Sequence, residues 1–259
     1  MNARLASAVG LTRSFLVYYG IPFRIRTLRR TYTQFLGPGD LAFDVGAHVG
    51  NRVLAWLRLG ARVIAVEPQP SCVRLLRRLY GRNPRVTIDP RAVSVAPGPV
   101  TLYLSARHPT LTTVSDRWVN RASNVEGFSH VRWERTVSVP ACTVDDLIAR
   151  YGMPRFIKVD VEGYEDQVIA SLSTPVEALS FEVLTADLDI ADRCIDHLER
   201  LCSYRYQFSA GESLRIDPSG WVDAAAIRAL LRSLPASITS GDVYATRSAH
   251  PHGAGSQRG

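Results

Sequence analysis

One short stretch limits what this chain can fold into more than any other: residues 41–51, with the sequence LAFDVGAHVGN. An apolar run reaches Asp44, glycines follow at Gly46 and Gly50, and a helical pattern begins directly afterwards. This order predicts a strand, a tight turn and the start of a helix, where glycine lets the backbone approach a ligand at a helix N-terminus. The stretch therefore predicts a nucleotide-binding α/β unit.

An acidic residue follows at the spacing that such a unit requires. The second apolar run, residues 61–66, ends at Glu67 and Pro68. An acidic side chain about 20 residues after the glycines is where the hydroxyl pair of a ribose is bound. We therefore expect Glu67 to bind a ribose. The alternative, a strand-turn-helix without a ligand, makes this spacing a coincidence.

His48 distinguishes between nucleoside ligands. In the dinucleotide fingerprint G-x-G-x-x-G, the second glycine sits where the pyrophosphate touches the backbone. This chain has His48 at that position, so its motif is G-x-x-x-G. A bulky imidazole disfavours NAD and favours a nucleoside without a pyrophosphate, and we expect S-adenosylmethionine. An NAD-dependent oxidoreductase is further disfavoured because the chain lacks a Tyr-x-x-x-Lys pair.

Apolar runs alternate with amphipathic segments along much of the chain. The runs that predict the main strands are residues 41–45, 62–66, 85–88, 155–160 and 178–183. Between the second and third of them we expect a helix that has Ser71 as its N-cap and ends at Gly81. Short strands that alternate with helices predict an α/β fold with a doubly wound, mostly parallel sheet.

The pattern also divides the chain into segments. Residues 1–36 predict an N-terminal helical extension, and residues 37–247 predict the nucleotide-binding domain. Within it, residues 98–139 alternate apolar and polar side chains around a polar middle. That predicts a β-rich insertion of strands and a loop. Residues 248–259 have the composition of a linker, and we expect a disordered tail.

Acidic residues stand at the carboxyl ends of four predicted strands. In a parallel sheet these ends meet on one edge, where ligands bind. An acidic rim suits a cationic sulfonium and its ammonium group, which is a further indication of S-adenosylmethionine. The four residues are Asp44, Glu67, Asp160 and Glu182.

Lys158 is the single lysine of a chain whose net charge of +7 otherwise comes from arginine. The period of two in a strand places it on the same side as Asp160. A lysine beside an acidic rim has a raised pKa, so we expect Lys158 to orient Asp160. As general base, Lys158 stays an alternative beside His48, Asp160 and Glu162.

The arginine-rich surface raises the question of an anionic partner. Residues 24–30 are the densest basic segment, and we interpret them as a solvated helix face. No alternation of basic and aromatic residues typical of a nucleic-acid module occurs, so no nucleic-acid partner is expected. Peripheral contact with a membrane stays open. No apolar run approaches the ~20 residues of a membrane span. Scattered cysteines and the lack of a signal-peptide pattern predict a cytoplasmic protein.

Four segments together resemble the FkbM family of S-adenosylmethionine-dependent methyltransferases. They are residues 43–50 (FDVGAHVG), 66–70 (VEPQP), 143–147 (TVDDL) and 157–165 (IKVDVEGYE). The resemblance covers roughly residues 40–185, and the last two blocks in this order are the specific part. The family usually has asparagine where this chain has His48. The resemblance implies a Rossmann-like class I methyltransferase fold and makes residues 37–247 the methyltransferase domain.

The resemblance also assigns parts of the site. It places the methionine portion of the cofactor near Asp44, Gly46 and Gly50, and the ribose on Glu67. It also places the adenine beside the backbone of Arg91 and Ala92, and turns Asp160 and Glu162 toward the transferring methyl group. With the residues derived above, the expected cofactor-binding set is Asp44, Gly46, Ala47, His48, Gly50, Asn51, Glu67, Pro68, Arg91, Ala92 and Asp160. The expected catalytic set is His48, Lys158, Asp160 and Glu162.

The implied reaction is methyl transfer to a hydroxyl of a sugar, glycolipid or secondary metabolite. A small-molecule or glycan acceptor is therefore expected, and the oligomeric state is left open. The competing interpretation is a non-catalytic methyltransferase fold that binds a partner. No metal is expected. The alternative is a magnesium ion held by Asp160, Glu162 and Glu182, because carboxylate oxygens suit a hard cation.

Overall fold

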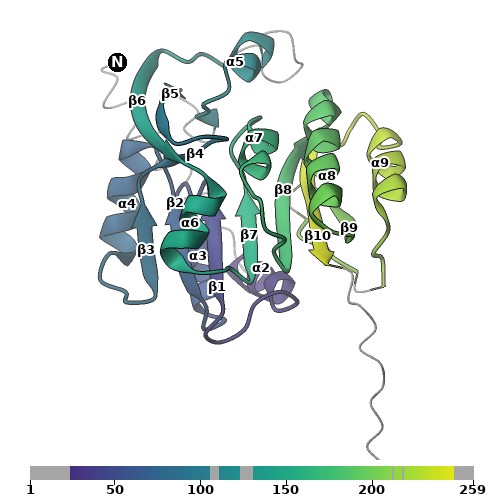
Figure 1. The fold of residues 1–259 in the computed structure, drawn as a ribbon, viewed down its shortest axis with the longest axis horizontal. Coiled ribbons are helices and arrows are strands. Elements are labelled where there is room, and N and C mark those ends of the chain that lie inside the picture. The colour runs from purple at the N-terminus through teal and green to yellow at the C-terminus, as the bar shows by residue number, and fades with distance from the viewer. Residues whose placement is uncertain (1–23, 106–110, 123–130, 212, 218, 248–259) are drawn as a thin grey trace, which may run out of the picture.

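The computed structural model describes residues 24–105, 111–122, 131–211, 213–217 and 219–247. A seven-stranded sheet with helices on both faces forms the centre, and a small three-stranded sheet lies beside its upper edge (Figure 1). The expected tail at 248–259 and the first 23 residues of the expected extension lie outside the described residues. The domain boundaries stay a prediction.

The central sheet confirms the predicted α/β class and its mostly parallel strands. Its strand order is β3-β2-β1-β7-β8-β10-β9, and β10, which pairs antiparallel with β8 and β9, is the one strand that runs opposite to the other six. Parallel pairing joins β1 to both β2 and β7, which places β1 at the centre. The strands are β1 (Leu41–Val45), β2 (Arg62–Val66), β3 (Val86–Asp89), β7 (Phe156–Val159), β8 (Ala178–Leu184), β9 (Tyr204–Ala210) and β10 (Ser240–Arg247).

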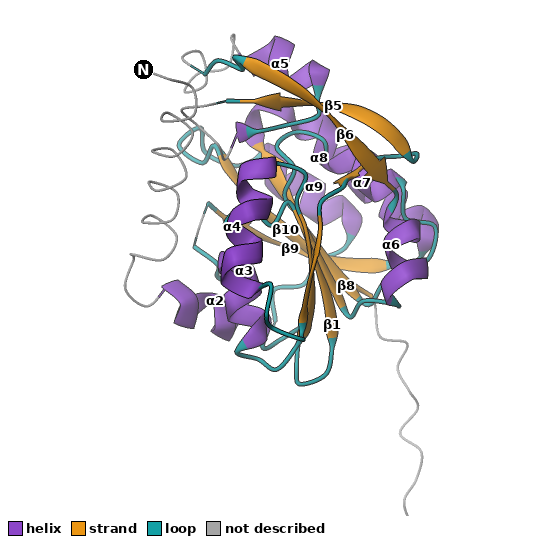
Figure 2. Ribbon diagram, turned by 90° about the vertical axis from the view of Figure 1, so that its left-hand side faces the viewer, coloured by secondary structure: helices purple, strands orange, loops and turns teal. Residues whose placement is uncertain are grey.

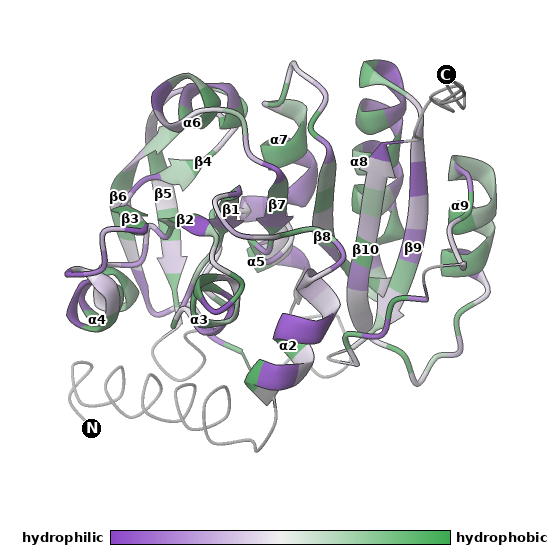
Figure 3. Ribbon diagram, turned by 90° about the horizontal axis from the view of Figure 1, so that it is seen from below, coloured by the Kyte–Doolittle hydropathy of each residue, from purple (hydrophilic) through white to green (hydrophobic). Residues whose placement is uncertain are grey.

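Helices cover both faces of this sheet (Figure 2). In Figure 3 the residues of α8 range from hydrophobic to hydrophilic, as expected for a helix with one face on a sheet. The helices on the central sheet are α2 (Arg24–Tyr32), α3 (Asn51–Leu57), α4 (Pro70–Tyr80), α6 (Val144–Tyr151), α7 (Glu165–Ala170), α8 (Leu188–Leu201) and α9 (Ala224–Arg232). A 3₁₀ turn, η2 (Thr185–Asp187), precedes α8.

The first residues of α6 and α4 show which local sequence signals determine where a helix begins. Thr143 and Asp146 form a capping box, each side chain accepting the other's backbone N–H, and so begin α6. The predicted N-cap Ser71 is wrong. Helix α4 begins at Pro70 after Gln69, without a side-chain cap. Proline suits the first helical position because its φ is already helical and it lacks an N–H that would need a partner.

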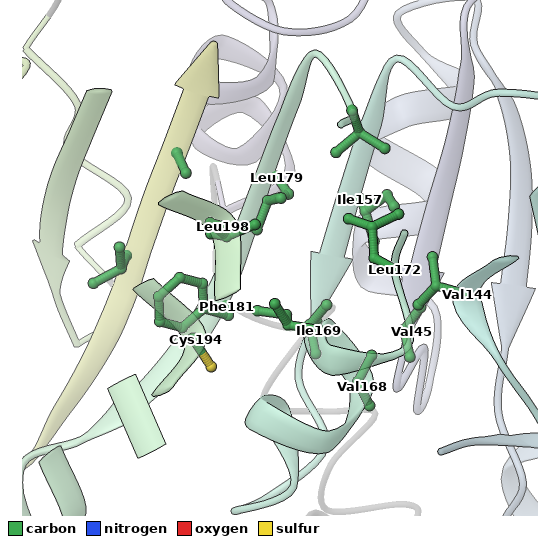
Figure 4. Packing of buried hydrophobic residues seen from close by; sticks show 14 of the residues in the cluster. Val45, Val144, Ile157, Val168, Ile169, Leu172, Leu179, Phe181, Cys194 and Leu198 are labelled. Atoms are coloured by element: carbon green, nitrogen blue, oxygen red, sulfur yellow. The ribbon is translucent and has the colours of Figure 1, made fainter. Parts of the chain in front are cut away.

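Side chains along β1 point alternately to the two faces of the sheet, so they belong to two different halves of the core. Leu41, Phe43 and Val45 face α6, α7 and α8, where they join the larger hydrophobic cluster shown in part in Figure 4. Ala42 faces the opposite side, under α2 and α3.

Aromatic rings fill this second half of the core. Tyr32 lies edge-on to Trp56, with ring centroids 5.2 Å apart, and to Phe156 at 5.4 Å. The described part of the expected extension is therefore packed into the core.

The segment after β3 forms the small sheet, which confirms the expected β-rich insertion. Strand β6 (Arg135–Cys142) lies between β4 (Ala92–Val93) and β5 (Gly98–Leu104). The insertion also contains α5 (Asp116–Ala122), where only a loop was expected. Ser115 Oγ accepts the N–H of Trp118 at 3.1 Å and so caps the start of this helix.

Candidate cofactor-binding and active site

A pocket of about 770 Å³, including its open mouth, lies at the carboxyl ends of β1, β2 and β7. This volume is in the range of ~300–1,000 Å³ typical of small-molecule sites. Strand β5 contributes Leu102 to its wall, and the segment between β5 and β6 contributes Thr112 to Val114. The expected residues that line it are Gly46, His48, Asn51, Glu67, Pro68, Arg91, Ala92, Asp160 and Glu162.

The other expected residues do not line this pocket. Ala47 and Asp44 are buried, and Lys158 is fully buried on the face of the sheet that α2 and α3 cover. Gly50 supports the pocket from behind, because a Cβ there would lie 2.7 Å from the side chain of Leu76 in α4. Its lack of a side chain therefore serves the packing of α3 on α4.

Gly46 makes the turn after β1. Its φ is +86°, and a Cβ would lie 1.8 Å from the carbonyl oxygen of Asp160 at the end of β7. Such an approach is closed to any residue with a side chain. The glycine therefore brings the ends of two neighbouring strands together beneath the pocket.

Glu67 connects the loops that follow β1 and β2. Its Oε2 accepts the backbone N–H of His48 at 2.8 Å, and its Oε1 accepts that of Gln69 at 2.7 Å. Burial raises the pKa of Glu67 to about 7, although both N–H groups act in the other direction. Each carboxylate oxygen keeps a lone pair that can accept a ribose hydroxyl.

His48 contributes its backbone N–H, as described above, and a half-buried ring at the pocket wall. Its φ of 46° lies in the left-handed region, which turns the chain toward α3. Burial lowers the pKa of its imidazole to about 4 and outweighs the charge of Asp160, which raises that pKa. The ring is therefore neutral near pH 7, and its low pKa makes it a weak base.

Asp160 is held by two cations. Its Oδ2 lies 2.9 Å from Arg52 Nη2 and 3.6 Å from Lys158 Nζ. Burial raises the pKa of Asp160, but the charges of Lys158 and Arg52 outweigh it and lower the pKa to about 2. Asp160 is thus a permanent anion at the rim. Sequence reasoning found Lys158 but missed Arg52, which no motif marks.

Lys158 makes its nearest ion pair elsewhere. Its Nζ donates to Asp242 Oδ1 at 2.8 Å and to the carbonyl oxygen of Val159 at 3.0 Å. Burial lowers the pKa of this fully buried ammonium, but Asp160 and Asp242 raise it above its usual value. A permanently charged lysine supports the orienting role and not that of a general base. Sequence reasoning missed Asp242, because β10 reaches the site only through the sheet order.

Three carboxyl groups gather beside the pocket. Asp160, Glu162 and Glu182 each place an oxygen within 4.8 Å of the other two. Burial, followed by the charge of Asp160, raises the pKa values of Glu162 and Glu182 well above the usual range. Such a trio could hold a hard divalent ion. However, Arg52 and Lys158 already neutralise much of the negative charge that would attract one.

The opposite end of the pocket is organised by Asp89, which sequence reasoning did not single out. Its carboxylate accepts from Arg91 Nε at 2.9 Å and Nη2 at 2.6 Å, and from the hydroxyl of Tyr151 at 3.0 Å. This bidentate pair fixes the backbone at Arg91 and Ala92. Both residues line the pocket where the adenine was expected.

The surroundings of Asp44 indicate whether a cationic nucleoside fits this site. Its side chain is 0% exposed, and neither carboxylate oxygen has a hydrogen-bond partner in the described part of the protein. Burial raises its pKa to about 6. A buried carboxyl without a hydrogen bond is costly; the charges of Arg52 and Lys158 reduce this cost, and a cation bound in the neighbouring pocket would reduce it further. With the free lone pairs of Glu67, it fits the charge pattern of S-adenosylmethionine.

Comparison with known proteins agrees with this fit. A family model described as the methyltransferase FkbM domain matches residues 44–232. No curated protein matches the chain. None of the described helices is long and apolar enough to cross a bilayer.

Two solved structures are similar in outline. One is a TehB-like SAM-dependent methyltransferase from Corynebacterium glutamicum, with 10% identity, a TM-score of 0.48, and 95% of this chain and 100% of that chain covered. The other is precorrin-6y C5,15-methyltransferase from Geobacter metallireducens, with 13% identity, a TM-score of 0.42, and 85% and 86% covered.

The family match spans the turn after β1, the acidic rim and the sheet as far as α9. It includes the insertion that carries the wall of the pocket. The fold is that of a class I methyltransferase, and the methyl donor is S-adenosylmethionine. The chain belongs to the FkbM methyltransferase family.

Proposed function

We propose that the protein transfers the methyl group of S-adenosylmethionine to a hydroxyl oxygen of a sugar, glycolipid or secondary metabolite. The observation that carries this proposal is the carboxyl cluster at the pocket, where Asp160 stays ionised and Glu162 has a raised pKa. A hydroxyl must lose its proton when it is methylated. A carboxylate with a raised pKa accepts that proton better than an ordinary one.

S-adenosylmethionine supplies an electrophilic methyl group on a cationic sulfonium when it is bound. Glu67 holds the ribose side of the donor, and Asp160 provides a fixed negative charge at the rim. A positive charge in the pocket lowers the pKa of a neighbouring carboxyl. Glu162 is therefore ionised when the donor is present, and it takes the proton of the acceptor hydroxyl.

The segment from Thr112 to Val114 supports a separate acceptor side. It lines the pocket and belongs to the insertion. The hydroxyl of Thr113 donates to the carbonyl oxygen of Glu162 at 2.8 Å, which joins the insertion to the proposed base. This link favours an enzyme over a non-catalytic fold that only binds a partner.

The test is a methyl-transfer screen with isotope-labelled donor against sugars, glycolipids and polyketides. The proposal expects label on an oxygen of the product, as determined by NMR. Label on nitrogen or carbon would contradict the hydroxyl assignment. Donor binding without transfer to any acceptor of these three classes would favour the binding protein.

A further inference from the structure

The positive charge of the protein is concentrated in one part of the sequence. Residues 24–88 contain twelve arginines and three acidic residues. None of these acids is exposed, because Asp44 and Glu67 are buried and Asp40 is half-buried. The surface of this part of the protein therefore presents arginine without exposed acidic neighbours from the same segment.

Several arginines elsewhere in the described protein form ion pairs with acidic residues. Arg193 contacts Asp166 at 2.6 Å, and Arg232 contacts Asp192 at the same distance. Six exposed arginines on or directly after α2, α3 and α4 form no ion pair with any described acidic residue. They are Arg29, Arg30, Arg58, Arg74, Arg77 and Arg78. We call this set the basic face.

The three helices that carry the basic face lie next to one another. Figure 2 shows α2, α3 and α4 together on the side of the molecule that faces the viewer, and Figure 3 colours much of α2 as hydrophilic. Arg74 lies one helical turn from Arg77 and Arg78 on α4, so their like charges repel. An anionic partner would remove this repulsion, and guanidinium groups bind phosphate with paired hydrogen bonds.

We propose that the basic face docks the protein on the surface of an anionic phospholipid membrane. Leu79 supports a lipid partner: its side chain is 42% exposed next to Arg78 and can enter the interface between headgroups. Clustered arginines beside an apolar residue are a usual means of binding acidic lipids.

Single-stranded nucleic acid is the less suitable partner. Its recognition depends on exposed aromatic rings that stack on bases. The aromatic side chains of α2, α3 and α4 are buried, with Tyr32 and Trp56 at 0% and Tyr80 at 7% exposure. The face therefore offers charge without a stacking surface.

Docking on this face also orients the pocket. Pro68 and Gln69 line the pocket and lead directly into Pro70, the first residue of α4. The mouth of the pocket thus borders the end of α4 that carries Arg74. The docking inference does not depend on which acceptor is methylated.

The experiment is co-sedimentation with two kinds of vesicle, phosphatidylcholine alone and phosphatidylcholine mixed with phosphatidylglycerol. We expect binding to the mixed vesicles only, weakened by salt. The triple variant Arg74→Gln/Arg77→Gln/Arg78→Gln should bind about 100-fold more weakly, since each basic residue near an anionic surface contributes roughly fivefold.

A matched control removes the same charge elsewhere. Arg200→Gln/Arg205→Gln/Arg215→Gln changes three exposed arginines outside the basic face and should keep vesicle binding within about fivefold of the wild type. Calorimetry with S-adenosylmethionine should show that both triple variants retain the pocket. Equal loss in both triple variants, or equal binding to both vesicles, would overturn the proposal. So would binding of a polyuridine oligonucleotide without binding to vesicles.

Discussion

The ammonium of Lys158 reaches across a neighbouring strand to Asp242, ending 2.8 Å from its Oδ1. Lys158 is on β7 and Asp242 is on β10, and β8 lies between them. Ser180 is the residue of β8 beside Lys158 in the register, and its small side chain leaves room for the lysine stem. A bulkier, planar guanidinium on a three-methylene stem would not reproduce this path, which explains why the single lysine is here.

The buried pair makes a stability prediction. Lys158→Met should lower the free energy of unfolding by about 3–5 kcal/mol, because it leaves the Asp242 carboxylate buried without its cation. Adding Asp242→Asn should restore part of this loss. Urea denaturation of both single variants and the double variant measures the coupling, and strictly additive values would show that the two groups do not stabilise each other.

The same lysine makes a prediction about activity. Lys158→Arg keeps the charge but displaces it from Asp160 and Asp242, so turnover should fall while donor affinity measured by calorimetry persists. Asp160→Asn should lower turnover further, because it removes the negative charge at the rim. Wild-type turnover in the Lys158→Arg variant would show that the lysine has a structural role only.

Donor binding should depend on pH through Glu67. Its pKa of about 7 means that the ribose-binding carboxylate is protonated in acid and ionised above neutrality. Affinity for S-adenosylmethionine should therefore rise as the pH increases through 7, as calorimetry can follow. Glu67→Gln should bind the donor more weakly by ~1–3 kcal/mol and lose that part of the pH dependence. Equal affinity in the variant at every pH would remove Glu67 from the donor site.

Acid stability should depend on Asp160. Its pKa falls from the usual 3.8 to about 2 in the folded protein, so its ionised form stabilises the fold. This contribution is complete above pH ~4 and is lost as the pH falls through ~2. The difference in free energy of unfolding between wild type and Asp160→Asn should shrink over this window by about 2 kcal/mol. A constant difference would mean that the cations do not act on Asp160.

The base assignment predicts the pH dependence of turnover. Glu162→Gln should lower kcat by ~10²–10⁴-fold and leave donor affinity nearly unchanged. The acidic limb of the wild-type kcat/KM profile for the donor, which reports the free enzyme, should lie well above the usual range of a glutamate, because the pKa of Glu162 is raised before the donor binds. The control is chelation: EDTA should have no effect. Loss of turnover in EDTA that magnesium restores would favour the metal alternative.

The local pattern of apolar and turn residues was sufficient to predict the central strands and the acidic residues at their carboxyl ends. Residues 41–45 and 62–66 are strands with the predicted bounds. A short apolar run between turn residues is typical of a buried strand. Glu67 and Asp160 follow their strands directly, so the parallel sheet brings them to one edge. Helix α5 was missed because its seven residues lack a clear apolar period and its cap at Ser115 lies in a polar segment.

The partners of the site residues were not predictable in the same way. Arg52 reaches Asp160 only because α3 lies over the end of β7, and Asp242 depends on β10 inserting between β8 and β9. Both contacts are set by the order of strands in space. A single sequence contains no local signal for that order, although it contains every residue that makes it.

The small sheet has a hydrophobic cluster of its own, formed by Ala92, Leu102, Val139 and Ala141. Substitutions among its surface residues therefore leave the interior of the central sheet undisturbed. A protein engineer could vary Thr112 and Val114 while keeping Thr113, which holds the backbone of Glu162, and the donor half of the pocket intact. The insertion tolerates variation, whereas the turn around Gly46 does not. New acceptor preferences can therefore be sought in the insertion without rebuilding the donor site.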